Sequence, residues 1–267
     1  MKPRLTIVPL GGLCNRIRVV LSAIHLAPTL PIPIVIEWGK DKDCFASFED
    51  LFLPVTGENY SFCNRTWYNH HNTRYNLKLP GLLRRFLYHR QQDSFHPYYH
   101  GTLHDFVDKH RRVYISTGFA LGDYPLDMVN LLRPRPELAE EIDKLVSQFS
   151  STTIGVHIRR TDHKEAIAHS SNEAFIRAMQ REIEIDASVK FYLATDDEDL
   201  KSALVKRFAG RIITQRTNCR RDTLQGIKEA VIDLYTLAET KKILGSFYSS
   251  FSGTASEFKN IPLEIVE

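Results

Sequence analysis

Short apolar segments alternate with segments of helical periodicity in this chain of 267 residues. Residues 5–8 form an apolar run, Gly11-Gly12 breaks it, and residues 14–27 then carry apolar side chains at helical spacing. A second apolar run follows at residues 34–36. A strand, a glycine turn, a helix and a second strand in this order indicate the first unit of a parallel sheet with right-handed crossovers. We therefore expect an α/β fold.

The second half of the chain repeats this alternation more clearly. Strands are predicted at residues 153–158, 190–194, 211–214 and 242–245, and helices at residues 134–149, 175–183, 197–208, 223–240 and from 253 onward. Ser170 and Glu173 predict a capping box at the second of these helices. A strand is also expected at residues 113–116, whereas residues 38–110 predict loops with short helices. Pro134 and Pro136 place a boundary between two small doubly wound domains, residues 1–133 and 134–267.

The composition excludes several classes of protein. A formal net charge of +3 is too small to indicate a nucleic-acid partner. No apolar run approaches the ~20 residues that cross a bilayer, and the first residues read as a strand rather than a signal peptide. The four cysteines form no CxxC pair and the eleven histidines match no zinc spacing, so no metal is expected. We expect a cytoplasmic protein without a transmembrane segment, and peripheral membrane contact stays open.

Two arginines follow the predicted strand at residues 153–158. His157, Arg159 and Arg160 lie at its end, with Asp162 just beyond, which is where open α/β sheets hold their ligands. A guanidinium group suits a phosphate because its planar fork donates two hydrogen bonds to one anion. Strand alternation sends the arginines to opposite faces, so one can brace the structure while the other, for which we favour Arg159, faces a ligand. The alternative is a surface ion pair between Arg160 and Asp162.

A glycine turn joins the first predicted strand to the first helix. Gly11 and Gly12 let the backbone approach a ligand, and the helix N-terminus offers N–H groups and a partial positive charge. Asn15 and Arg16 add hydrogen-bond donors. The spacing is not GxGxxG, so a nicotinamide cofactor is disfavoured. A purely structural turn is the alternative.

Carboxylates stand at two further places. We interpret Asp196 and Asp197 as part of a helix cap, with Thr195 or Asp196 as the capping residue, rather than as metal ligands. Asp233 lies beside an apolar stripe of the helix at residues 223–240 and needs a partner. A guanine edge and an ion pair within the protein would satisfy it equally well.

Hydroxyl groups follow the last predicted strand. Ser249, Ser250 and Phe251 lie between that strand and the final helix. Hydroxyls and backbone N–H groups at a helix N-terminus form a ready anion site. A serine-rich helix cap without any ligand is the alternative.

Four segments, taken together, resemble one family. The likeness is to the successive motifs of the α1,6-fucosyltransferases, which include bacterial nodulation enzymes and animal N-glycan core enzymes and are distantly related to the protein O-fucosyltransferases. The segments that carry it are His157-Ile158-Arg159-Arg160-Thr161-Asp162, residues 192–197, residues 230–234 and Phe247-Tyr248-Ser249-Ser250. The loop at residues 11–16 is similar to the first turn of the family.

The resemblance implies a GT-B-like fold of two small Rossmann-like domains with a donor cleft between them. It also implies GDP-fucose as donor, inversion at the anomeric carbon and no required metal. Residues 1–133 would lie on the acceptor side, and residues 134–267 would bind the GDP-sugar.

The resemblance further implies roles for single residues. Arg159 would contact the diphosphate and support the departing GDP, and Asp162 matches a position important for activity. Asp233 would hold the guanine. Phe251 stands where the family has a polar residue. The donor-binding residues would be His157, Arg160, Asp233, Ser249, Ser250, Phe251, Gly11, Gly12, Asn15 and Arg16.

The leading hypothesis is an inverting glycosyltransferase that moves fucose from GDP-fucose to a hydroxyl of a glycan or glycoconjugate. A catalytically silent GDP-sugar or glycan-binding protein is the alternative from another class. A transferase that uses a different nucleotide sugar is the alternative among enzymes.

Overall fold

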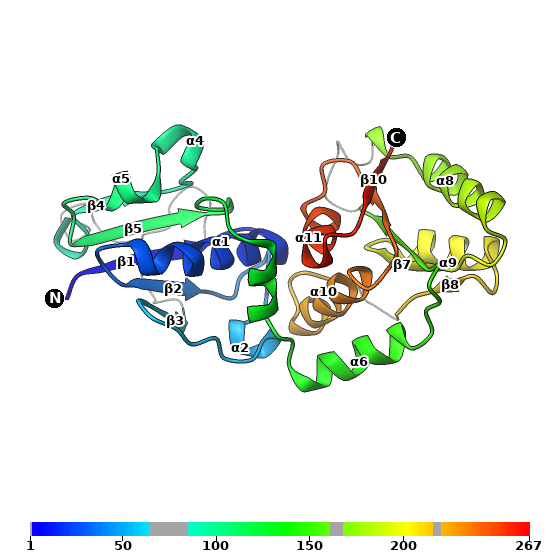
Figure 1. Cartoon of the computed structure of the whole chain (residues 1–267), viewed down its shortest axis with the longest axis horizontal. Helices are drawn as coiled ribbons and strands as arrows, with labels where there is room; N and C mark the ends of the chain where they lie inside the picture. The colour runs from blue at the N-terminus through cyan, green and yellow to red at the C-terminus, as the bar shows by residue number, and fades with distance from the viewer. Residues whose placement is uncertain (1, 65–84, 161–167, 216–219) are drawn as a thin grey trace. The chain divides into compact units, whose positions relative to one another are not determined.

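The computed structural model describes residues 2–64, 85–160, 168–215 and 220–267. The chain divides into two compact units. The N-terminal unit holds Met1–Arg133 and Arg221–Leu224, and the C-terminal unit holds Pro134–Arg220 and Gln225–Glu267. Each unit is built on a parallel five-stranded sheet flanked by helices, which confirms the predicted α/β class (Figure 1).

The N-terminal sheet has the strand order β3-β2-β1-β5-β4, and its described strand pairs are parallel. The elements of this unit are β1 (Arg4–Pro9), α1 (Leu13–Leu26), the 3₁₀ helix η1 (Ala27–Thr29), β2 (Ile34–Trp38), α2 (Phe48–Leu51), β3 (Tyr60–Asn64), β4 (Arg90–Gln92), α4 (Pro97–His100), α5 (Leu103–Val107), β5 (Arg112–Thr117) and the 3₁₀ helix η2 (Leu126–Leu131). β1, α1, β2 and β5 lie where the sequence predicts them.

The sequence prediction of loops for residues 38–110 misses two strands. β3 and β4 are the edge strands of this sheet. β4 consists of one arginine and two glutamines, so it has no apolar run that a sequence pattern could detect. It forms because its backbone pairs with β5, in the register Arg90 to Val113. Pairing with the neighbouring strand, rather than local sequence, therefore determines that these edge strands form.

The C-terminal sheet has the order β10-β9-β6-β7-β8. The elements of this unit are α6 (Pro136–Val146), β6 (Ile154–Ile158), α8 (Asn172–Ile185), β7 (Phe191–Thr195), α9 (Glu198–Arg207), β8 (Ile212–Ile213), α10 (Leu224–Leu237), β9 (Ile243–Ser246), α11 (Ser250–Lys259) and β10 (Leu263–Val266). With its strands renumbered one to five in chain order, the sheet order is 3-2-1-4-5, the doubly wound arrangement. The order reverses between β6 and β9, the point where such sheets hold ligands.

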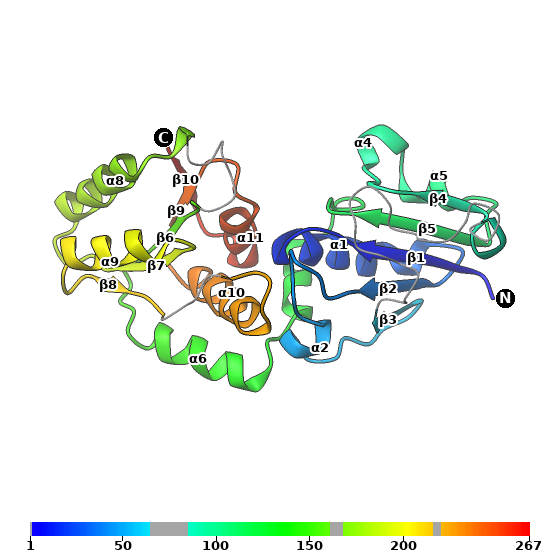
Figure 2. The ribbon, with the colours of Figure 1, turned by 180° about the vertical axis from the view of Figure 1, so that it is seen from behind.

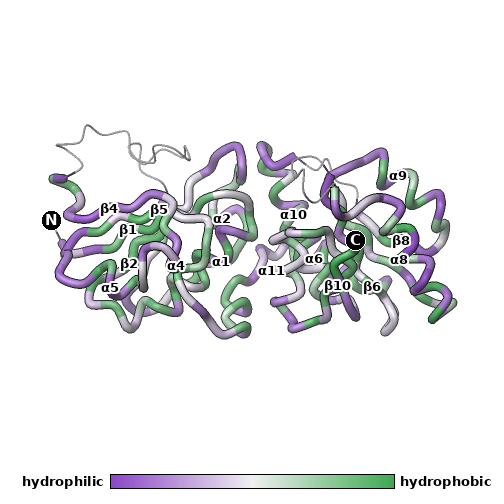
Figure 3. Tube along the Cα trace, turned by 90° about the horizontal axis from the view of Figure 1, so that it is seen from above, coloured by the Kyte–Doolittle hydropathy of each residue, from purple (hydrophilic) through white to green (hydrophobic). Residues whose placement is uncertain are grey.

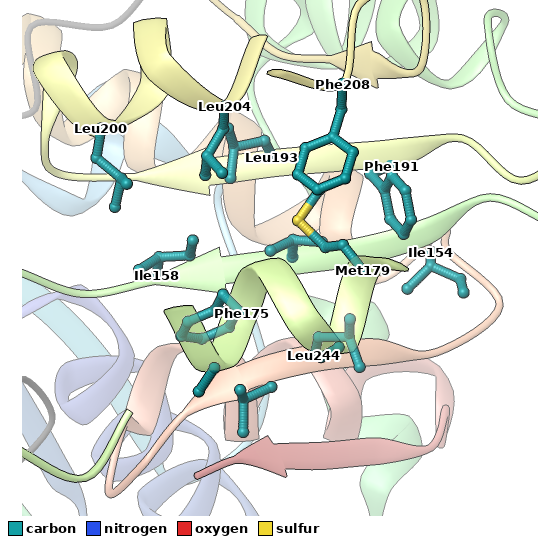
Figure 4. Packing of buried hydrophobic residues seen from close by; sticks show 14 of the residues in the cluster. Ile154, Ile158, Phe175, Met179, Phe191, Leu193, Leu200, Leu204, Phe208 and Leu244 are labelled. Atoms are coloured by element: carbon teal, nitrogen blue, oxygen red, sulfur yellow. The ribbon is translucent and has the colours of Figure 1, made fainter. Parts of the chain in front are cut away.

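Helices cover both faces of the C-terminal sheet. Figures 1 and 2 show α8 and α9 on one side and α10 and α11 on the other. Ile154, Val156 and Ile158 of β6 belong to the buried cluster under α8 and α9, together with Phe175 and Met179 of α8 (Figure 4). Burial of each such side chain contributes about 1.5–3 kcal/mol relative to leaving it exposed. Since strand side chains alternate, His157 faces α10 and α11 instead.

Several helix ends differ from the sequence prediction. α8 begins at Asn172 and is capped by Ser171, whose side chain accepts from Ala174 N, so Ser170 is not the cap. α9 is capped by Asp197, one residue later than predicted. α11 begins at Ser250 rather than 253 and ends at Lys259, after which the unpredicted strand β10 completes the sheet.

Figure 3 shows hydrophobic residues along strands of both sheets, whereas β4 consists of polar residues. Among the helices that the structure describes, none is long and apolar enough to cross a bilayer.

Candidate functional site

The strands that carry the predicted motifs end side by side in the C-terminal unit. His157 of β6 pairs with Ala194 of β7 on one side and with Gly245 of β9 on the other. The arginines after β6, the aspartates after β7 and the serines after β9 therefore leave the same carboxyl edge of the sheet. This edge includes the switch point between β6 and β9.

Hydrogen bonds tie the end of β6 to the end of β9. The backbone N of Arg159 donates to Ser246 Oγ at 3.0 Å, and Ser246 Oγ donates to the carbonyl of His157 at 3.4 Å. The backbone N of Phe247 donates to Ser170 Oγ at 2.8 Å. Ser246 and Ser170 are fully buried, so these bonds fix the backbone at the switch point.

The two arginines of the motif are held differently. The guanidinium of Arg160 donates to Asn172 Oδ1 at 2.7 Å, to the Ser170 carbonyl at 2.7 Å and to the Arg159 carbonyl at 2.9 Å. Its backbone N donates to Asp196 Oδ1 at 2.7 Å. Arg160 thus braces the edge of the sheet. Arg159 is half-buried, with its backbone fixed beside the turn after β9.

The turn between β9 and α11, residues 247–249, is here called the serine turn, and the N-terminus of α11 lies directly after it. Tyr248 adopts a left-handed backbone conformation with φ of 53°, which is unusual for a residue other than glycine. Ser249 then caps the helix without a side-chain capping bond. Its Oγ is buried and has no hydrogen-bond partner among the residues that the structure describes. A buried hydroxyl of this kind needs a partner, and the first N–H groups of α11 supply positive potential beside it.

A glycine lets α11 approach the sheet. A Cβ at Gly245 would stand 2.8 Å from both Ser252 Oγ and Leu263 Cδ1, which is closer than such atoms pack. Any larger residue at this position would push α11 away from β9. The serine turn therefore depends on a glycine in the strand that precedes it.

Phe251 packs on His157, one of the predicted donor-binding residues. The rings of His157 and Phe251 are stacked, with centroids 4.8 Å apart and an interplanar angle of 22°. His157 is 8% exposed. The aromatic residue that replaces a polar one in the serine motif therefore orients the histidine from α11.

Asp233 of α10 is held by neutral donors. Its Oδ1 accepts from the hydroxyl of Tyr192 at 2.5 Å and from Gln215 Nε2 at 2.5 Å. Burial raises the pKa of Asp233 to about 6, although these two hydrogen bonds oppose the shift. Burial also raises the pKa of Tyr192 far above its usual value, and the neighbouring Asp233 adds to this effect. An ion pair, one of the two alternatives that the sequence leaves open, is not among these contacts, and none of them joins Asp233 to the serine turn.

The carboxylates after β7 serve the structure. Asp197 Oδ1 accepts from Leu200 N at 2.9 Å as the cap of α9, and Asp196 holds the backbone of Arg160. The cap of α9 is thus Asp197, and the prediction of Thr195 or Asp196 as the capping residue is wrong. In the described part of the chain, no group of three or more His, Cys, Asp or Glu side chains could hold a metal ion.

The glycine turn of the N-terminal unit encloses its arginine. Gly11 has a φ of 77° and Gly12 caps α1. The guanidinium of Arg16 is fully buried, where it donates to the carbonyls of Gly11 and Gly39 and pairs with Asp41. Arg16 therefore holds the shape of the turn by binding the backbone oxygen of Gly11.

Asn15 is placed differently from its neighbour Arg16. It is half-buried, and its amide makes no hydrogen bond with the described residues. Its Nδ2 lies 2.9 Å from the position of a Cβ at Gly11 and 3.8 Å from that of a Cβ at Gly118. Asn15 is thus the side chain that the glycine turn presents near the end of β5. From the sequence, Asn15 and Arg16 are both candidate hydrogen-bond donors to a ligand. Only the fold shows that Arg16 is enclosed and that Asn15 lies near the end of β5.

Two site residues escape sequence reasoning, and one lies outside the described structure. Ser246 belongs to the serine segment but was not singled out, and Ser170 was predicted only as a helix cap. Both are hydroxyls adjacent to a strand or helix end, a signal too common to select them. Asp162 lies outside the described residues.

Two units with parallel five-stranded sheets give the α/β architecture of GT-B-like proteins. No protein-family model matches the sequence, and no curated protein matches it either. The structure is similar to NodZ alpha-1,6-fucosyltransferase soaked with GDP-fucose, with a TM-score of 0.62 and 17% identity over 97% of this chain and 93% of that chain. It is also similar to fucosyltransferase NodZ from Bradyrhizobium, with a TM-score of 0.60 and 18% identity over 96% of this chain and 92% of that one.

A second group of solved structures shares this fold. POFUT1 in complex with GDP has a TM-score of 0.61 and 13% identity over 99% of this chain and 98% of that chain. At these identities the likeness establishes the fold. The predicted resemblance to the α1,6-fucosyltransferases and protein O-fucosyltransferases is confirmed at that level.

Proposed function

We propose that this chain is an inverting glycosyltransferase that transfers fucose from GDP-fucose to a hydroxyl of a glycan acceptor. One observation carries the proposal: the backbone N of Arg159 is bonded to Ser246 at the end of β9, at the switch point of the C-terminal sheet. Three residues further on, the N-terminus of α11 adjoins the buried Oγ of Ser249, which has no hydrogen-bond partner among the described residues. An arginine, a helix N-terminus and a hydroxyl without a partner together suit a diphosphate.

The proposed donor site uses each group for one part of the nucleotide. Arg159 contacts the diphosphate, and Ser249 and Ser250 donate to the phosphate oxygens. His157, stacked on Phe251, borders the nucleoside. Arg160 acts on the donor indirectly, because its guanidinium is bonded within the protein and fixes the backbone of Arg159.

Asp233 is the proposed guanine contact. Tyr192 and Gln215 occupy Oδ1, so Oδ2 is the oxygen that would accept from the N–H groups of the base. These donors also hold the carboxylate in one orientation. A recognition group held in this way discriminates bases well, because a base that lacks the N–H groups leaves the carboxylate unpaired.

Transfer breaks the bond between the anomeric carbon and the oxygen of the β-phosphate. The acceptor oxygen attacks from the opposite face, which inverts the anomeric centre, and its proton leaves to a base. Negative charge develops on the departing diphosphate, and a preorganised arginine with the N-terminus of α11 stabilises it. Asp162 is a proposed catalytic residue through the family resemblance.

The N-terminal unit is the proposed acceptor side, and the C-terminal unit is the proposed donor side. Gly11, Gly12 and Asn15 of the glycine turn are proposed as further donor contacts. Arg16 joins this group as a positioning residue, because its guanidinium is enclosed beneath the turn.

Calorimetry with GDP, UDP and ADP tests the donor, and a GDP-release assay with GDP-fucose tests the chemistry. We expect GDP to bind most tightly, and GDP-fucose to release GDP faster when an oligosaccharide acceptor is present. Addition of EDTA should leave this rate unchanged. Preference for UDP or ADP would contradict the assignment of the base. Tight GDP binding without turnover on any acceptor would favour the silent binding protein instead.

A further inference from the structure

An exposed group of aromatic rings in the N-terminal unit belongs to none of the motifs that the sequence singles out. His96, Tyr98 and Tyr99 at α4 and Phe119 after β5 form this aromatic cluster. The ring of His96 lies 4.4 Å from that of Phe119, 5.4 Å from that of Tyr99 and 6.4 Å from that of Tyr98. Tyr98 is 83% exposed, Tyr99 76% and Phe119 53%. Large rings gathered in this way on a surface mark a binding site more often than scattered ones do.

The aromatic cluster stands at the carboxyl edge of the N-terminal sheet. β4 leads into α4, and β5 leads into Phe119, so both parts follow strand ends (Figure 1). The order β3-β2-β1-β5-β4 reverses between β1 and β5, which is the ligand position of an open α/β sheet. The neighbour of Phe119, Gly118, lies beside Asn15 of the glycine turn. The cluster is therefore continuous with a proposed donor-binding loop of the same unit.

Hydrogen bonds hold the backbone under the rings. Thr117 Oγ1 donates to the carbonyl of Phe95 at 2.6 Å and accepts from the backbone N of Phe119 at 2.9 Å. The backbone N of His96 donates to His100 Nδ1 at 3.0 Å, and the backbone N of Tyr98 donates to His96 Nδ1 at 3.1 Å. Rings on a backbone fixed in this way lose little freedom on binding, which favours affinity.

The chemistry of the rings indicates an amphipathic, flat partner. His96, Tyr98 and Tyr99 each combine an apolar ring face with a polar group at the rim. The face of an aromatic ring carries negative potential and attracts weakly positive hydrogens, while the hydroxyls and imidazole can form hydrogen bonds. A pyranose ring matches both properties, because its axial C–H groups form an apolar face and its hydroxyls surround it.

We propose that the aromatic cluster is a platform on which a pyranose ring of the acceptor glycan stacks. The proposal rests on the proposed function, which it deepens by naming a subsite on the acceptor side. The class of ligand is an oligosaccharide with flat, equatorially substituted rings. Stacking there would hold an acceptor close to the glycine turn of the same unit.

Saturation-transfer NMR with cellotetraose tests the platform without any donor. Cellotetraose offers flat ring faces, and mannitol, an open-chain polyol, is the control ligand. We expect saturation transfer to cellotetraose and not to mannitol. Amide shifts induced in the wild-type protein should centre on Tyr98, Tyr99 and Phe119. No transfer to cellotetraose, or shifts confined to other parts of the chain, would overturn the proposal.

Ring-preserving and ring-deleting substitutions separate stacking from general hydrophobicity. Tyr98→Leu and Tyr99→Leu should each raise the dissociation constant for cellotetraose about threefold to tenfold, the range expected for one aromatic contact. Tyr98→Phe and Tyr99→Phe should bind nearly as well as wild type. Phe86→Leu, which removes another exposed ring of the same unit, is the matched control and should have no effect. Leucine variants that fold and bind normally would refute ring stacking.

GDP calorimetry on the same variants separates this inference from the proposed function. The leucine variants should bind GDP as wild type does. A wild-type protein that binds cellotetraose but not GDP would retain the platform and lose the proposed function. A wild-type protein that binds GDP but not cellotetraose would retain the proposed donor site and lose the platform.

Discussion

Arginines lie at the carboxyl edge of both sheets, and the two units hold them in different ways. In the N-terminal unit, Arg16 is fully buried between Asp41, the carbonyl of Gly11 in the glycine turn and the carbonyl of Gly39. In the C-terminal unit, Arg160 is bonded to the segment before α8, and Arg159 lies half-buried beside the serine turn. Each unit thus has one arginine that fixes its edge, and the C-terminal unit has a second.

This difference separates structural cations from candidate functional ones. A guanidinium has five N–H donors, so a single arginine can fix several backbone carbonyls at the end of a strand. Arg16 and Arg160 do this. The backbone N of Arg159 is bonded to Ser246, three residues before Ser249, whose buried hydroxyl has no hydrogen-bond partner among the described residues. The proposed donor site therefore lies in the C-terminal unit, and the edge of the N-terminal unit carries the exposed aromatic cluster.

The largest effect is expected from Arg16→Ala. The substitution leaves the carboxylate of Asp41, whose side chain is 7% exposed, without its cation. Breaking one partner of a buried pair costs about 3–5 kcal/mol of the free energy of unfolding. Urea unfolding should show this loss, whereas Asn15→Ala on the same helix should change stability by no more than about 0.5 kcal/mol. Unchanged stability with lost GDP release would make Arg16 a substrate contact and remove the contrast between the units.

Arg159→Ala should act on catalysis rather than on stability. We expect GDP release from GDP-fucose to fall about 10²–10³-fold, the effect of removing one donor to a developing negative charge. The urea midpoint should stay close to that of wild type. Arg207→Ala, which removes an exposed arginine of α9 in the same unit, is the control. Near-normal turnover in Arg159→Ala would remove this residue from its proposed role.

The third prediction concerns pH and the base. Only the ionised carboxyl of Asp233 can accept hydrogen bonds with both of its oxygens, at Oδ1 from Tyr192 and Gln215 and at Oδ2 from the N–H groups of guanine. Because its pKa is raised to about 6, the carboxyl becomes protonated within the pH range in which binding can be measured. The ratio of GDP affinity to UDP affinity should therefore fall about tenfold per pH unit below this value. UDP carries the same diphosphate, so the ratio cancels the titration of the phosphates. Asp233→Asn should weaken GDP more than UDP, and equal weakening would contradict guanine recognition.

Asp233 also has a consequence for stability. Its pKa is raised in the folded state, so folding favours the protonated form, and stability should fall as pH rises from about 4 through about 6. Asp233→Asn removes this penalty. The variant should match wild type in urea unfolding at pH 4 and exceed it at pH 8. The opposite order at pH 8 would show that the ionised carboxylate stabilises the fold.

The smallest effect is expected from Ser249→Ala. The hydroxyl has no partner within the described structure, so its removal should leave the free energy of unfolding unchanged or slightly raised. A lost phosphate hydrogen bond should weaken GDP and UDP equally, by about fivefold. Ser252→Ala is the control, because this buried hydroxyl donates to the Ser249 carbonyl and serves the helix. Unchanged affinity in Ser249→Ala would leave the turn a helix cap without a ligand.

The sequence predicts the parts of the fold that are locally encoded. The apolar runs of β1, β2, β5, β6 and β7 reveal these strands, because each is buried on both faces by helices. β4 has no such run, and β10 lies where the sequence predicts helix, because edge strands gain their stability from one neighbour. Helix ends shifted by one to three residues where several hydroxyls compete for one cap, as Ser170 and Ser171 do before α8.

For the candidate site, the sequence determines which chemistry is present. It supplies two arginines after a buried strand, a carboxylate in an apolar helix and a run of serines before the last helix. Strand alternation predicts that one of the two arginines braces the structure, and the contacts of Arg160 agree with this. The ligand contact of Arg159 stays a prediction. The tertiary structure alone decides that Arg160 and Arg16 are bonded within the protein and that Asp233 rests on Tyr192 and Gln215. It also decides that Phe119 joins the ring of His96 at one edge. These contacts join residues far apart in the chain, and local sequence patterns carry no information about which distant side chains meet.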